Sequence, residues 1–112
     1  MNIFIRWLAS AVAVIISSYF LPGVVVSGLL SALLVAVIIG VLNILIRPIL
    51  IILTLPINIL TLGLFTFVIN ALIIMLASGL TPGFHVDGFW WALLFSIILS
   101  VINALFDRIG NR

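Results

Sequence analysis

Few residues in this chain could take part in chemistry. His85 and Asp87 stand two positions apart after a Pro-Gly dipeptide, and such a pair could respond to protons or touch a metal ion. Two ligands without a third make a weak metal site, so a solvated polar turn is the more ordinary interpretation. The chain has no Glu, Lys or Cys and one His. No nucleophile–base pair, phosphate loop or zinc motif can be assembled, so we expect no enzymatic activity, no cofactor and no metal.

The composition indicates a membrane protein. Hydrophobic residues make up 67% of the chain, and only six of its 112 residues are charged, whereas about a quarter are charged in a typical soluble domain. A helix that crosses a bilayer needs ~20 mostly apolar residues. Four such stretches are present, at residues 4–21, 28–47, 62–80 and 89–106. We therefore expect a single all-α integral membrane domain over residues 1–112, with four transmembrane helices and the lipid bilayer as its main partner.

An internal repeat predicts how these helices are arranged. Residues 22–46 align without a gap on residues 82–106, and eleven of the twenty-five positions are identical. The pattern predicts two tandem helical hairpins, unit A at 5–46 and unit B at 65–106, each with a Pro-Gly turn between two apolar helices. Both hairpins enter and leave on the same side, so the repeat is parallel, unlike the inverted repeats common in transporters.

The charges predict the orientation. All four Arg fall at the ends of helices on one face, and no Lys or Arg occurs in the Pro-Gly turns: Arg6, Arg47, Arg108 and Arg112. By the positive-inside rule, this face and both termini are cytoplasmic. A nucleic-acid binder would show a basic stripe on a soluble surface, and these scattered Arg do not form one. We expect no nucleic-acid partner, and the sequence identifies no small-molecule substrate.

The apolar segment 48–61 between the two units has no counterpart in the repeat. It could extend the preceding helix, but Arg47 would then lie in mid-bilayer, where a charged side chain is costly. Because Pro48 and Pro56 both disfavour a helical residue before them, we favour a broken re-entrant or interfacial segment on the cytoplasmic side.

Small residues recur at every fourth position of two helices and predict close helix packing, either within the chain or between copies. The residues of this candidate packing or oligomer face are Gly28, Ala32, Ala36, Gly40, Gly88, Ala92, Ser96 and Ser100. Four further residues are candidate polar or lipid-headgroup positions, although helix–helix hydrogen bonds and a topology anchor are the simpler roles: Asn43, Arg47, Asn70 and Asn103.

The segments 43–65 and 82–103 resemble the mycobacterial-type four-span phage holin family, holin superfamily IV, which includes YvlD-like small membrane proteins. The resemblance rests on Arg47-Pro48, Pro82-Gly83 and Gly88-Phe89 together with Asn43 and Asn103. It covers nearly the whole chain and implies a bacterial inner-membrane protein. The family name implies hole formation.

Three functions remain open from the sequence. The first is a holin-like protein whose copies associate as a homo-oligomer and permeabilise the inner membrane. The second is a non-lytic envelope or stress-response membrane protein, which demands no particular chemistry. The third is a small channel or transporter, which both Asp residues disfavour because they lie outside the apolar stretches.

Overall fold

The two Pro-Gly turns pair with each other in the computed structural model, which describes residues 2–110. β1 (Val24–Val26) and β2 (Phe84–Val86) form an antiparallel ribbon in which Val25 lies opposite His85. Hydrogen bonds from Ser27 N to Gly83 O and from Asp87 N to Gly23 O, both 2.8 Å long, extend the ribbon at its two ends. The two predicted turns, one in each repeat unit, are therefore joined in one structure.

Four long apolar helices lead into and out of this ribbon: α1 (Ile3–Tyr19), α2 (Leu29–Leu45), α5 (Phe65–Leu80) and α6 (Phe89–Gly110). The Asn2 side chain caps the start of α1 by accepting a hydrogen bond from Phe4 N at 2.7 Å. Gly28 and Gly88 precede α2 and α6 with φ values of 151° and 117°, which glycine adopts far more easily than other residues.

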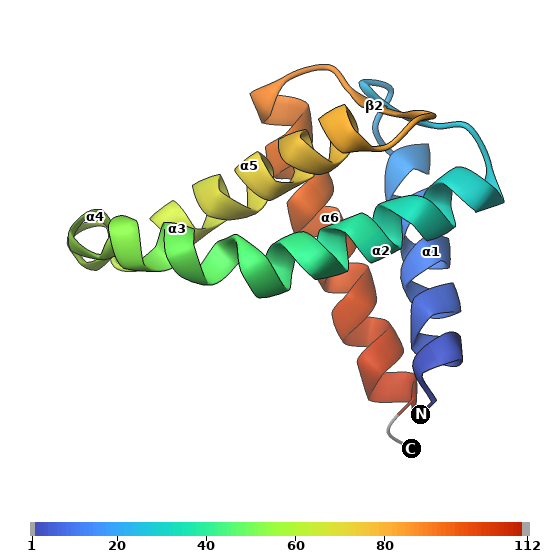
Figure 1. Cartoon of the computed structure of the whole chain (residues 1–112), viewed down its shortest axis with the longest axis horizontal. Helices are drawn as coiled ribbons and strands as arrows, with labels where there is room; N and C mark the ends of the chain where they lie inside the picture. The colour runs from blue at the N-terminus through green and yellow to red at the C-terminus, as the bar shows by residue number, and fades with distance from the viewer. Residues whose placement is uncertain (1, 111–112) are drawn as a thin grey trace.

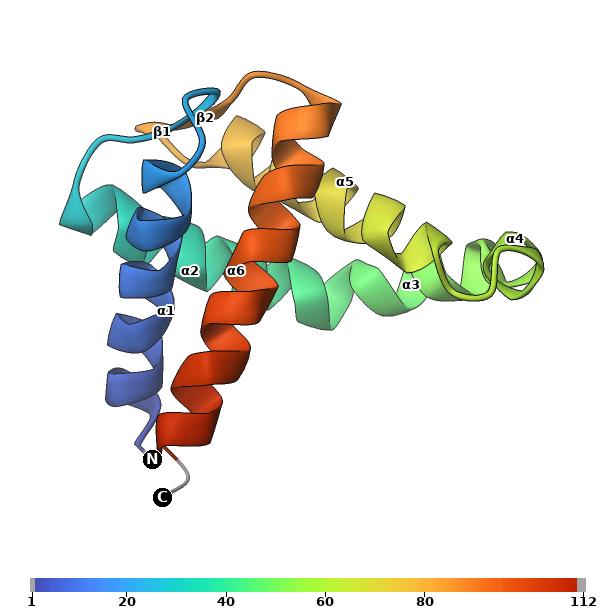
Figure 2. The same cartoon turned by 180° about the vertical axis from the view of Figure 1, so that it is seen from behind.

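The helices diverge from the ribbon in two pairs. In Figure 1, α1 and α6 descend side by side toward the two termini, while α2 and α5 extend sideways to α3 and α4 at the left. Figure 2 shows the same divergence from behind. α1 packs on both α2 and α6, and α5 packs on both α6 and α2. The result is a bundle that is closed at the ribbon and open at the other end.

The core lies near the ribbon, where the four helices are closest. Small side chains permit this approach: Ala11, Ala32, Ala77 and Ala92 are completely buried. The core also contains Phe95, whose ring centroid lies 5.6 Å from that of Phe84 in β2. The ribbon is therefore packed onto the helices through its inward-facing side chains, while Val25 and His85 face outward.

The segment between α2 and α5 is broken, as its prolines predict. α2 ends at Leu45, and α3 (Arg47–Leu53) continues at an angle of 41° to it. α4 (Leu55–Leu60) follows after a second break at Thr54. Each short helix has a proline in its first turn, where the missing N–H costs nothing. Thr54 Oγ1 donates a hydrogen bond of 2.6 Å to Leu50 O, which satisfies its hydroxyl group at the break.

The expectation of four full-length spans is met only in part. Among the described helices, α6 alone is long and apolar enough to cross a bilayer by itself, and the bent pair α2–α3 provides a second candidate. α1 and α5 are apolar but have only 17 and 16 residues, or about 25 Å and 24 Å. Compared with the expected stretches, α1 stops before residues 20–21, which lead into the ribbon, and α5 begins only after the turn at residues 62–64.

Candidate functional site

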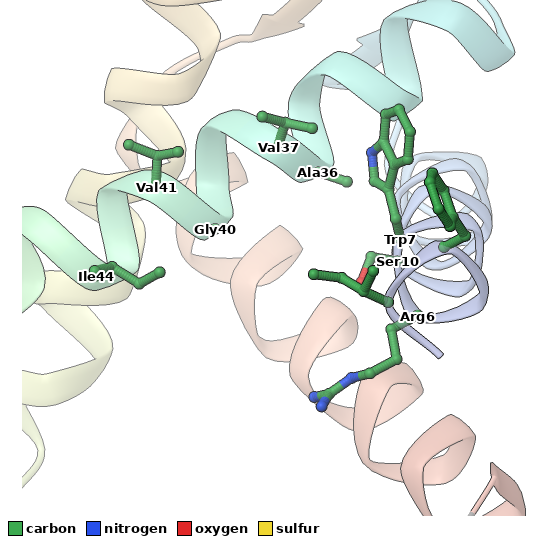
Figure 3. Close-up of a pocket in the computed structure, with 10 residues that line it drawn as sticks. Arg6, Trp7, Ser10, Ala36, Val37, Gly40, Val41 and Ile44 are labelled. Atoms are coloured by element: carbon green, nitrogen blue, oxygen red, sulfur yellow. The ribbon is translucent and has the colours of Figure 1, made fainter. Parts of the chain in front are cut away.

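The divergence of α1 from α2 leaves a wedge-shaped cavity of about 640 Å³ between them. Most of its lining side chains are apolar, and Arg6, Trp7 and Ser10 on α1 are the polar exceptions. The remaining lining residues are Ile3 and Phe4 on α1 and Ala36, Val37, Gly40, Val41 and Ile44 on α2. Figure 3 shows the two helices on either side of this wedge.

Trp7 bridges the two walls of the wedge. Its indole Nε1 donates a hydrogen bond of 2.9 Å to the backbone carbonyl of Leu33 on α2. An indole N–H in an apolar environment requires a partner, and this bond supplies one. The contact fixes how far α1 and α2 separate, and so sets the width of the cavity on that side.

Arg6 lies between the wedge and a second, smaller cavity. The smaller cavity has a volume of about 140 Å³ and lies between α1 and the end of α6, where Arg6, Ser10, Asn103 and Asp107 provide polar groups beside Ala9 and Phe106. Figure 3 shows the Arg6 side chain extending from α1 toward α6. Among the described residues, the Arg6 guanidinium and the Asp107 carboxylate form no ion pair with each other. We call this smaller cavity the polar pocket.

The predicted small-residue rows divide into three groups. Ala32, Ala92 and Ser96 are buried where the helices are closest, and Ala36 and Gly40 line the wedge. Ser100 is exposed on α6.

The glycines of these rows leave open space beside their helices. A Cβ built on Gly28, Gly40 or Gly88 would meet no atom within 4 Å. Gly28 and Gly88 have backbone angles at the starts of α2 and α6 that favour glycine, and their part in packing within the chain or between copies stays a prediction. Gly40 leaves room in the wedge.

The predicted polar positions are largely separate. Asn43 is exposed on α2, Asn70 is half-buried in α5, and Arg47 is half-buried at the first residue of α3. Asn103 alone joins a polar group, in the polar pocket. Within residues 2–110, no side-chain hydrogen bond links these three amides to another helix.

His85 and Asp87 do interact, with 2.6 Å between Nε2 and Oδ1, but both side chains are more than half exposed. In the described part of the chain they belong to no group of three potential metal ligands. The pair is a surface contact on the ribbon.

No pattern in the sequence indicated the polar pocket. Arg6 and Asp107 are near opposite ends of the chain, so no spacing rule connects them. From the sequence, Arg6 and Trp7 indicated only a helix end at the membrane interface, where basic and aromatic residues are common.

Comparison with known proteins identifies the family. The description "Mycobacterial 4 TMS phage holin, superfamily IV" matches residues 1–105. The chain belongs to this holin family. One relative, the "Uncharacterized membrane protein YvlD" of Bacillus subtilis, is 38% identical over 109 residues, covering 93% of this chain and 92% of the relative. Another relative of this holin-family chain, the "Uncharacterized protein SCO3922" of Streptomyces coelicolor, is 37% identical over 112 residues, covering 91% and 90% of the two chains. No solved structure matches the chain.

Proposed function

We propose that this holin-family protein associates in the bacterial inner membrane and permeabilises it by thinning the bilayer locally. In this proposal the four long helices all enter the membrane as two parallel hairpins, with the ribbon outside and both termini cytoplasmic. The family description, the parallel repeat and the distribution of Arg support this arrangement. The segment 48–61 lies at the cytoplasmic interface.

The length of the helices is the observation that carries the proposal. α1, α2 and α5 contain 17, 17 and 16 residues, so each is about 24–25 Å long. The hydrocarbon core of a typical bilayer is ~30 Å thick. A short span is accommodated by thinning the bilayer or by oligomerisation, at a cost of fractions of a kcal/mol per Å. Several copies together would share one thinned region, which favours their association.

A hole would require more than one copy. The wedge, the larger of the two cavities described above, is lined mainly by apolar side chains. The helices carry few polar groups that face outward, and Asn43 on α2 and Ser100 on α6 are two of them. We propose that these two side chains contribute to a polar lining when copies come together, because an exposed amide or hydroxyl group in hydrocarbon gains from a hydrogen-bonding partner.

The decisive experiment is membrane potential and dye entry in bacteria after induced expression at matched membrane levels. The unmutated protein is expected to depolarise the cells, and the double variant Asn43→Leu with Ser100→Leu is expected to lose this effect. Both side chains are exposed, so the double variant should fold normally. Ile44→Leu, at an exposed apolar position beside Asn43, is the matched control and should behave like the unmutated protein.

A non-lytic envelope or stress-response protein is the second candidate. The outer surface favours this second candidate. Exposed Leu, Ile, Val and Phe side chains dominate the described part of each long helix, so these helices present no broad polar face that could line a lumen. Intact potential at high, verified membrane levels of the unmutated protein would overturn permeabilisation and leave this second function.

A further inference from the structure

We propose that the wedge and the polar pocket together bind one phospholipid whose headgroup carries a phosphate and a primary ammonium. An acyl chain occupies the wedge, and the headgroup lies in the polar pocket. This inference concerns a ligand and stands apart from permeabilisation.

The wedge has the size and chemistry of an acyl-chain site. Its volume of about 640 Å³ is within the ~300–1,000 Å³ typical of ligand pockets. Phe4, Val37 and Val41 provide apolar walls, and nothing lies within 4 Å of a Cβ built on Gly40. In a bilayer, an open apolar space of this size between two helices must be filled, and a hydrocarbon chain fills it without leaving a polar group unsatisfied.

Arg6 and Trp7 mark the level at which the headgroup would lie. Arg6 lines both cavities, so a lipid that occupies the wedge and the polar pocket would contact this side chain. Guanidinium groups bind phosphate through several N–H donors in a fixed plane. Trp7 is held by its hydrogen bond to Leu33 O, and tryptophan is enriched at the depth where acyl chains meet headgroups.

The charges in the polar pocket select the headgroup. Arg6 offers a positive charge to a phosphate, while Asp107 offers a negative charge to a cation, and Asn103 and Ser10 add uncharged polar groups. A headgroup with only negative charge would face the Asp107 carboxylate, which is unfavourable. A quaternary ammonium has no N–H to donate to that carboxylate. Ethanolamine, with a primary ammonium beside the phosphate, matches both charges.

The test uses the full chain in detergent, mixed with equal amounts of phosphatidylethanolamine, phosphatidylglycerol and phosphatidylcholine of identical acyl chains. Native mass spectrometry then counts the lipid retained by each protein molecule. We expect one retained lipid, with phosphatidylethanolamine preferred roughly tenfold over each of the others, a factor that one favourable interaction can supply. Equal retention of the three lipids, or a preference for phosphatidylglycerol, would overturn the headgroup assignment.

Three variants separate the parts of the site. Arg6→Gln should reduce retention of all three lipids, whereas Asp107→Asn should keep retention but remove the preference for ethanolamine. Gly40→Leu should block the wedge and abolish retention. Gly79→Leu is its control, because Gly79 on α5 also has nothing within 4 Å. Undiminished lipid retention in Gly40→Leu would contradict the wedge as the acyl-chain site. A change from dimer to monomer in that variant would instead assign the wedge to a second copy of the chain. These readouts need no membrane potential, so they fail or succeed independently of permeabilisation.

Discussion

Val25 and His85 are cross-strand partners at the centre of the ribbon. They are also equivalent positions of the internal repeat, sixty residues apart. The flanking pairs Val24–Val86 and Val26–Phe84 exchange equivalent positions of the two halves. This register is what a twofold axis between Val25 and His85 would produce. We propose that the two hairpins are related by such an axis along the membrane normal.

The ribbon should be sensitive to side chains at its glycines. Gly83 has a φ of 83°, and a Cβ there would collide with the Ser27 and Ser31 hydroxyl groups. Gly83→Ala is expected to lower the free energy of unfolding by about 1–2 kcal/mol, the cost of a left-handed conformation, or by more if the collision is not relieved. Thermal unfolding in detergent measures this. Gly79→Ala, within α5 and free of neighbours, should be neutral or slightly stabilising, and equal losses in both variants would refute the argument.

The Trp7–Leu33 hydrogen bond should stabilise the pairing of α1 with α2. Trp7→Phe keeps an aromatic ring but removes the Nε1 donor, and is expected to lower stability by ~0.6–2 kcal/mol, the range for polar contacts between membrane helices. Trp90→Phe is the control because Trp90 is 74% exposed. Unfolding followed by circular dichroism would show the difference, and identical stability of the two variants would count against the bond.

Association should depend on bilayer thickness. Three of the four long helices are shorter than a typical hydrocarbon core, so thicker bilayers increase the mismatch and favour oligomers. Energy transfer between labelled copies, measured in vesicles of short-, medium- and long-chain lipids at one protein-to-lipid ratio, should rise with acyl-chain length. If the signal is the same in all three bilayers, mismatch does not drive association.

Arg47 should act as a topology anchor at the first residue of α3. Arg47→Glu removes one of the four positive charges of the proposed cytoplasmic face. We expect a fraction of the molecules to insert in the inverted orientation. Accessibility of tags at both termini, in cells and in inverted vesicles, measures this fraction. Arg47→Lys keeps the charge and should preserve the orientation, and unchanged accessibility in Arg47→Glu would remove the anchor role.

Local signals in the sequence predicted the helical elements well. Pro48 and Pro56 indicated the breaks that begin α3 and α4, because proline is favoured in the first turn of a helix and disfavours a helical residue before it. The apolar stretches likewise indicated the four long helices, although α1 and α5 are shorter than the full spans expected.

Long-range features were not predictable in the same way. Three consecutive valines at Val24–Val26 carry no alternating pattern, so nothing indicated that they pair with a segment sixty residues away. Gly28 and Gly88 belong to rows of small residues spaced four apart. Their positive φ angles give a second reason for glycine at these positions, and the spacing did not indicate it. The wedge depends on how α1 and α2 diverge, and the contacts between them, such as the Trp7–Leu33 hydrogen bond, are not encoded in the periodicity of either helix.

The register of the ribbon has a consequence for the origin of the chain. Because each pair joins equivalent positions of the two halves, a peptide covering only residues 1–46 could make the same strand pairing with a second copy of itself, as symmetric dimers do. We propose that the present chain corresponds to such a homodimer with its subunits fused, and that segment 48–61 serves as the tether between them. A tether is constrained only in its length and its apolar character. On this proposal, segment 48–61 needs no counterpart in either half of the chain.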